Sequence, residues 1–155
     1  AVSESLRLSV RRASLPHPAS PIARITVQVP SSVDCIAEAV SVVTRHCLAG
    51  AIAGPQVRFR LQVALSEALA NAIVRGNRED ASKRVWVQAD LGPEQICLHV
   101  TDEGDGFDPA AVPDALLPEG LAQEGGRGLF LIHRMVDDVH FNAQGNSICM
   151  TLRRP

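Results

Sequence analysis

The stretch Leu65–Asn77, LSEALANAIVRGN, says more about the fold than any other part of this 155-residue sequence. Its apolar residues follow helical spacing, and we expect a helix over residues 57–75. Glu67, Asn71 and Arg75 are four residues apart, so a helix places their side chains in one stripe. The neighbouring positions hold small residues, which let another group approach closely: Ala68, Ala70 and Ala72. The stripe is either the solvent face of an ordinary helix or one wall of a binding site.

The second informative segment is Asp102–Phe107, DEGDGF, at the end of a strand predicted over residues 95–102. A carboxylate at a strand end, here Asp102, can accept a hydrogen bond from the amino group of a ligand. Gly104 and Gly106 leave room for a flat ring beside the backbone. The alternatives are a plain acidic turn and a calcium loop, but the spacing lacks the later ligands of an EF-hand, including its bidentate glutamate.

The third segment is Gly125–Ile132, GGRGLFLI, which opens a helix predicted over residues 126–137. Backbone N–H groups at such a helix start, unobstructed by Cβ atoms, bind anions such as phosphate. No Gly-Lys-Ser/Thr follows, so the segment is not a P-loop. No βαβ unit surrounds it, so it is not a Rossmann fingerprint either. A glycine-rich helix start without a ligand is the remaining alternative.

The rest of the chain alternates between strand-like and helical patterns. Strands are expected over residues 24–29, 83–91, 95–102, 138–142 and 146–153, and a further helix from residue 33 to about Gly50. The strands have one apolar and one polar face, which is typical of antiparallel sheets covered by helices on one side. Residues 108–124 form a long loop with three prolines, a kind of loop usually kept for function. Residues 1–21 are expected to be a flexible N-terminal segment before a folded domain over residues 22–155.

Composition excludes several classes of function. The net charge of −2 gives no electrostatic reason to expect direct binding of nucleic acid or of a membrane surface. No apolar run approaches the roughly 20 residues that span a bilayer, and the start does not resemble a signal peptide. The cysteines are far apart and form no C-x-x-C pair, which favours buried thiols in a reducing compartment: Cys35, Cys47, Cys97 and Cys149. We therefore expect a cytoplasmic protein.

In order and spacing the three segments resemble the nucleotide-binding boxes of the Bergerat-fold superfamily of gyrase, heat-shock chaperones, histidine kinases and MutL. Within it, Ser66-Glu67-Ala68 with Asn71-Ala72, and GGRGLFLI, resemble the anti-sigma-factor serine/threonine kinase family. The stretch ITVQVPSSVDCIAEAVSVV at residues 25–43 also resembles that family, and the likeness covers about residues 24–153. It implies an α+β fold, a two-layer sandwich of a mixed, mostly antiparallel sheet with helices on one face.

The resemblance also implies ATP and Mg²⁺ as ligands. Asn71 would give its side-chain oxygen to Mg²⁺ on the phosphates, and one protein ligand suffices because magnesium keeps several waters. Asp102 would recognise the adenine amino group. Gly104, Gly106 and Phe107 would shape the base pocket.

For the phosphates, the resemblance implies contacts from the third segment, with residues 108–124 as a lid. The candidate residues are Gly125, Gly126, Arg127, Gly128 and Leu129. Glu67 would be the general base that removes a proton from an attacking hydroxyl. Arg75 stands where many relatives have a histidine, so it is carried over only as a phosphate or partner contact. The lid contains no lysine, which leaves Arg127 as the candidate cation nearby.

The implied function is an ATP-dependent serine kinase and anti-sigma factor. Its partners would be a sigma factor and an anti-anti-sigma antagonist, which it would phosphorylate on Ser or Thr, and relatives commonly form homodimers. The alternative is a nucleotide-responsive binding module with little or no kinase activity. A histidine kinase catalytic domain is disfavoured, because the sequence has no pair of dimerisation helices carrying a phosphoacceptor histidine.

Overall fold

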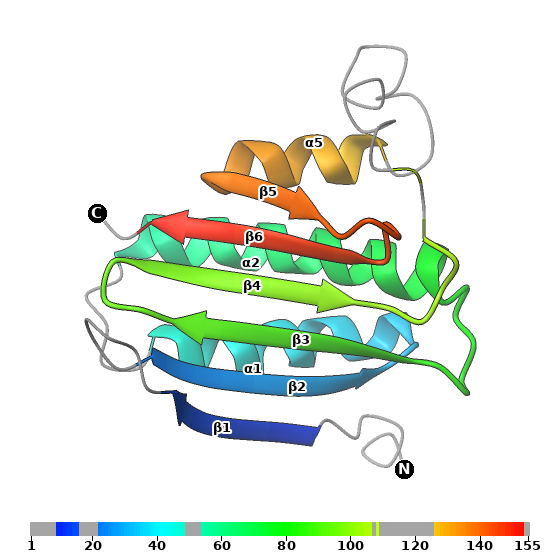
Figure 1. Ribbon diagram of the computed structural model, residues 1–155, viewed down its shortest axis with the longest axis horizontal. Helices are drawn as coiled ribbons and strands as arrows, with labels where there is room; N and C mark the ends of the chain where they lie inside the picture. Colours follow the sequence, from blue (N-terminus) through cyan, green and yellow to red (C-terminus); the bar gives the residue numbers. More distant parts are fainter. Residues whose placement is uncertain (1–8, 16–21, 49–53, 107, 109–125, 154–155) are drawn as a thin grey trace.

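Within the described part of the chain, the sheet has six antiparallel strands. The computed structural model describes residues 9–15, 22–48, 54–106, 108 and 126–153. The strands are β1 Ser9–Leu15, β2 Ile22–Pro30, β3 Arg84–Leu91, β4 Gln95–Thr101, β5 Asp138–Phe141 and β6 Ser147–Arg153. Their order across the sheet is β1-β2-β3-β4-β6-β5 (Figure 1).

The helices lie on one face of this sheet (Figure 1). A short 3₁₀ turn, η2 Val33–Cys35, leads into α1 Ile36–Leu48. Helix α2 Pro55–Ala70 continues into a π-helical segment, η3 Asn71–Gly76, and α5 spans Gly126–Met135. This arrangement confirms the α+β two-layer sandwich and the Bergerat fold.

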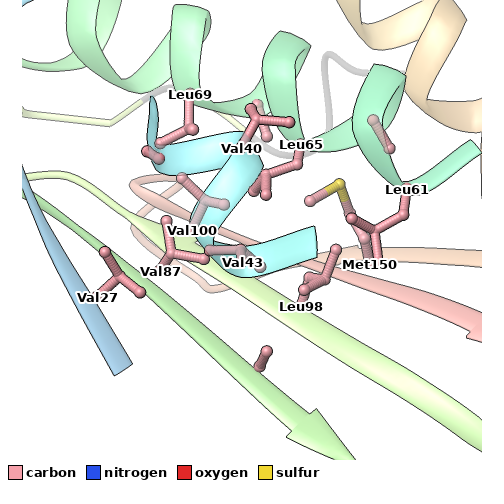
Figure 2. Packing of buried hydrophobic residues seen from close by; sticks show 14 of the residues in the cluster. Val27, Val40, Val43, Leu61, Leu65, Leu69, Val87, Leu98, Val100 and Met150 are labelled. Carbon is pink, nitrogen blue, oxygen red and sulfur yellow. The ribbon is translucent and has the colours of Figure 1, made fainter. Parts of the chain in front are cut away.

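The core between the layers is aliphatic. Leu61, Leu65 and Leu69 are four residues apart on α2, and all three are fully buried. Alternate strand residues face them, as the period of two requires. Figure 2 shows these leucines packed with Val40 and Val43 of α1 and with the sheet residues Val27, Val87, Leu98, Val100 and Met150. The one-sided strand pattern expected from the sequence is therefore confirmed.

Two expectations about the sheet are wrong. Ser9–Leu15, expected to be part of a flexible segment, pair with β2 as the edge strand β1. An edge strand is held by the backbone of its neighbour, so a polar composition does not prevent its formation. The sheet was also expected to be mixed and mostly antiparallel, whereas every pairing between the described strands is antiparallel.

Helix α5 ends at Met135, two residues before the expected end. Arg60 of α2 donates from Nε to the Met135 carbonyl oxygen at 2.6 Å and from its guanidinium to the Asp137 carboxylate at 3.4 Å. The last carbonyl of α5 is thus capped by a side chain of the neighbouring helix. The expected lid lies outside the described residues, except for Asp108.

None of the helices in the described part of the chain is both long and apolar enough to cross a membrane.

Candidate functional site

The helix that carries Glu67 and Asn71 changes its winding at Asn71. The Asn71 N–H donates to the carbonyls of Glu67 and Ala68, and the Asn77 N–H reaches back five residues to the Ala72 carbonyl at 2.8 Å. A π-helical turn contains more residues than an α-helical turn, and such segments are frequent at functional sites.

Arg75, the third residue of the predicted stripe, lies within the π-helical segment and is exposed. Glu67 and Asn71 are half-buried. The alignment of all three side chains in one stripe stays a prediction.

Glu67 and Asn71 meet the start of α5 at Gly128. Gly128 is buried, and a Cβ atom built on it would lie 2.9 Å from Glu67 Oε2. The same atom would lie 3.4 Å from Asn71 Nδ2 and 3.6 Å from Asn71 Oδ1. An added Cβ would require the Glu67 carboxylate to shift, so the first turn of α5 lies directly against both side chains. The first and third sequence segments are therefore neighbours in the fold.

The polar atoms of these two side chains are available to a ligand. Both side chains are half-buried, and no hydrogen bond joins either of them to another described residue. A carboxylate and a carboxamide side by side on a helix offer oxygen atoms to a proton or a hard cation.

Asp102, directly after β4, is held by the turn that leads into β6. Its N–H donates to the Asn146 carbonyl at 2.9 Å, and the Asn146 side chain donates back to the Asp102 carbonyl at 3.1 Å. The Asp102 carboxylate packs against the Cα of Gly76, so closely that a Cβ at Gly76 would collide with it. A Cβ at Gly104 would collide with the Gly76 carbonyl. The end of the π-helical segment and the loop after β4 are therefore in direct contact.

Asp102 is a partly buried carboxylate at the candidate site. Burial raises the pKa of its carboxyl, although the Gly104 N–H donates to Oδ1 at 2.8 Å and the charge of Lys83 acts in the opposite direction. A carboxylate whose desolvation is not fully compensated within the protein gains from an additional hydrogen-bond donor supplied by a ligand.

Gly106 places the loop after β4 against the turn between β5 and β6. Its φ of +78° belongs to the left-handed region that favours glycine. A Cβ there would collide with the Gln144 carbonyl. This contact was missed from the sequence, because it depends on β4 and β6 being neighbours.

The remaining residues that the sequence predicts for the nucleotide site are Phe107, Gly125, Gly126, Arg127 and Leu129. Phe107 and Gly125 lie outside the described residues. Gly126 opens α5, and Arg127 is exposed in its first turn. Leu129 is half-buried and packs against the core.

Gly76 and Asn77 contact the candidate site but were not predicted from the sequence, where the expected helix ends before them at residue 75. The sequence feature that could have identified them is a glycine at the end of a helix that carries polar side chains. Their partner, the loop after β4, is distant in sequence.

Among the described residues, no group of three or more His, Cys, Asp or Glu could hold a metal ion. The Asn71 side chain nevertheless offers a hard oxygen, and one such ligand with several waters suits Mg²⁺ on phosphates.

We expect Gly76→Ala to weaken ATP binding by at least about tenfold, because the new methyl group would displace the Asp102 carboxylate. Titration calorimetry with Mg-ATP measures this effect. Gly54→Ala is the matched control, since Gly54 has nothing within 4 Å of its added Cβ and an ordinary φ of −67°. Equal affinity in the two variants would contradict the close contact.

Comparisons with known proteins point to one family. The family model of the histidine kinase-like ATPase domain matches residues 29–152. The serine-protein kinase RsbW of Bacillus subtilis (strain 168) is 32% identical over 98 residues, which are 59% of this chain and 61% of that protein. The serine-protein kinase RsbW of Oceanobacillus iheyensis is 33% identical over 91 residues, which are 54% of this chain and 57% of that protein. The chain thus spans about three fifths of the length of these relatives.

Proposed function

The chain belongs to the histidine kinase-like ATPase domain family, and from that premise we propose that it is an ATP-dependent serine-protein kinase and anti-sigma factor. The family implies ATP binding, and the relatives of about 30% identity are named serine-protein kinases. The observation that carries the proposal is the meeting of Glu67 and Asn71 with the start of α5 at Gly128.

Adenine binds where the loop after β4 meets the end of the π-helical segment. The Asp102 carboxylate accepts a hydrogen bond from the exocyclic amino group, which relieves part of the cost of burying this charge. Gly76 and Gly104, which lack side chains, let the π-helical segment and the loop after β4 pack closely against each other at this carboxylate.

The phosphates lie near the start of α5. Its free backbone N–H groups and the exposed Arg127 supply positive potential there. Asn71 would hold Mg²⁺, which supplies charge neutralisation on the phosphates when bound.

Glu67 acts as the general base. Its carboxylate removes the proton of a serine hydroxyl while that oxygen forms a bond to the γ-phosphorus and the bond to the β,γ-bridging oxygen breaks. ADP leaves, and the proton remains on Glu67. Glu67 is half-buried and its side chain has no hydrogen bond to another described residue, which leaves the carboxylate oxygens available for this task.

The protein partners belong to the same proposal. A sigma factor would be sequestered by the chain, and an anti-anti-sigma antagonist would carry the serine that is phosphorylated. Support comes from the likeness of residues 24–153 to anti-sigma-factor kinases and from the relatives named above.

A second candidate function is a nucleotide-responsive binding module with little or no kinase activity. It is favoured by residues 108–124, which contain no lysine that could stabilise the transferred charge. Labelled γ-phosphate from ATP should appear on a serine of the antagonist if the chain is a kinase. Tight ATP binding and nucleotide-dependent partner binding without any transfer would instead establish the module.

We expect Asn71→Ala to remove the magnesium dependence of ATP binding, because the variant lacks the oxygen that would hold Mg²⁺. Calorimetric affinities with magnesium and with a chelator should then agree within about twofold, near the chelator value of the wild type. Gln62→Ala, which removes a carboxamide from the same helix, should keep the wild-type dependence. An Asn71→Ala variant with full magnesium dependence would refute the assignment.

A further inference from the structure

Asn77 is a buried polar side chain whose carboxamide is hydrogen-bonded through both its nitrogen and its oxygen. It is 1% exposed and directly follows the π-helical segment. Its Nδ2 donates to Ser31 Oγ and to the Arg84 carbonyl, both at 2.9 Å. Its Oδ1 accepts from the Glu103 N–H at 2.8 Å. A single carboxamide thus uses two donors and one acceptor on three different segments.

These three segments meet at one end of the neighbouring strands β2, β3 and β4. Ser31 follows β2, Arg84 opens β3 and Glu103 lies in the loop after β4; the end of β4 and the start of β3 lie side by side in Figure 1. The Arg84 N–H also donates to Glu103 Oε2 at 2.6 Å. The loop after β4 is therefore fastened both to the helix end and to β3.

The bond from Glu103 fixes the residues on either side of it. Asp102 precedes Glu103, and the N–H of the following Gly104 donates to the Asp102 carboxylate at 2.8 Å. Gly104 also rests on the carbonyl of Gly76, the residue before Asn77. Gly76 and Asn77 together define where the Asp102 carboxylate lies, Gly76 by contact and Asn77 by hydrogen bonding.

We propose that Asn77 is the positioning residue for base recognition, which holds the loop after β4 so that the Asp102 carboxylate meets the exocyclic amino group of adenine. The inference rests on the proposed nucleotide site. Asn77 would thus set the preference for a purine with an amino group over one with a keto group, although it does not touch the base. In inosine triphosphate a carbonyl oxygen replaces the amino group, and it would face the carboxylate as a second acceptor.

The test is the ratio of the dissociation constants for ATP and inosine triphosphate, measured by calorimetry with magnesium. The wild type should prefer ATP by about a hundredfold. Asn77→Ala should lose about tenfold of this preference, through weaker ATP binding alone. Asn77→Asp keeps an acceptor for the Glu103 N–H and should retain more of the preference than Asn77→Ala.

A purely structural role would not move this ratio, because partial unfolding lowers the amount of active protein for both nucleotides equally. Ser31→Ala is the matched control: it removes a buried partner of Asn77 without touching the Glu103 N–H, so it should lower the melting temperature and keep the ratio within about twofold. If Asn77→Ala does not fold, Asn77→Ser, which is too short to reach Glu103, takes its place.

The outcomes separate the two proposals. A wild type without preference for ATP would overturn the proposed base site itself. A wild type with that preference, shared undiminished by the folded alanine or serine variant, would overturn only the role of Asn77.

Discussion

Glu67→Gln is expected to abolish phosphate transfer to the serine acceptor while Mg-ATP binding stays within about twofold of the wild type. Glutamine has the size of glutamate, and so fits beside Gly128, where Glu67 Oε2 already lies close to the backbone of α5. It cannot take the proton of the attacking hydroxyl. Loss of a general base lowers the rate by about 10²–10⁴-fold.

The measurement is the initial rate of transfer of labelled γ-phosphate, with nucleotide affinity measured on the same preparation. Glu38→Gln makes the same chemical change at an exposed position of α1 and should leave both quantities unchanged. Transfer by Glu67→Gln at the wild-type rate would remove Glu67 from the mechanism.

Asp102→Asn is expected to lower ATP affinity by about a hundredfold or more. The variant keeps an oxygen that can accept from the Gly104 N–H, so the loop has no reason to move. It loses the charge that strengthens the hydrogen bond to the adenine amino group, and it places an amide donor near that group. Calorimetry with ATP measures the effect, and unchanged affinity would contradict it.

The same substitution should stabilise the ligand-free protein at neutral pH. Because burial raises the pKa of Asp102, its protonated form is favoured in the folded state. The contribution of this group is fully present below the ordinary aspartate pKa of about 3.9 and is lost as pH rises through the raised value. Denaturant unfolding at several pH values should show this loss in the wild type and not in Asp102→Asn. A variant less stable than the wild type at pH 7 would contradict the cause given for the pKa shift.

The sequence predicts those features that repeat along one segment. Leu61, Leu65 and Leu69 reveal their helix by spacing, and the alternation in β3 and β4 reveals which side of each strand is buried. Glu67 and Asn71 are found for the same reason, because one α-helical turn separates them and the π-helical winding begins only at Asn71.

Features that depend on contacts between distant segments escape such a reading. The close approach of Gly76 to Asp102, the bond from Glu103 to Asn77 and the contact of Gly106 with Gln144 all join segments that become neighbours only in the folded sheet. Strand β1 was missed for a similar reason. It forms by pairing with β2, and its own composition does not indicate a strand.

We expect ATP to bind between the Glu67–Asn71 helix, the loop after β4 and the start of α5. A crystal structure of the chain with Mg²⁺ and the non-hydrolysable β,γ-imido analogue of ATP would show this binding mode. In that structure we expect the adenine amino group within hydrogen-bonding distance of the Asp102 carboxylate, Asn71 Oδ1 on the metal and the phosphates at the start of α5. An adenine bound elsewhere, with Asp102 still packed against Gly76 and without a ligand, would contradict it.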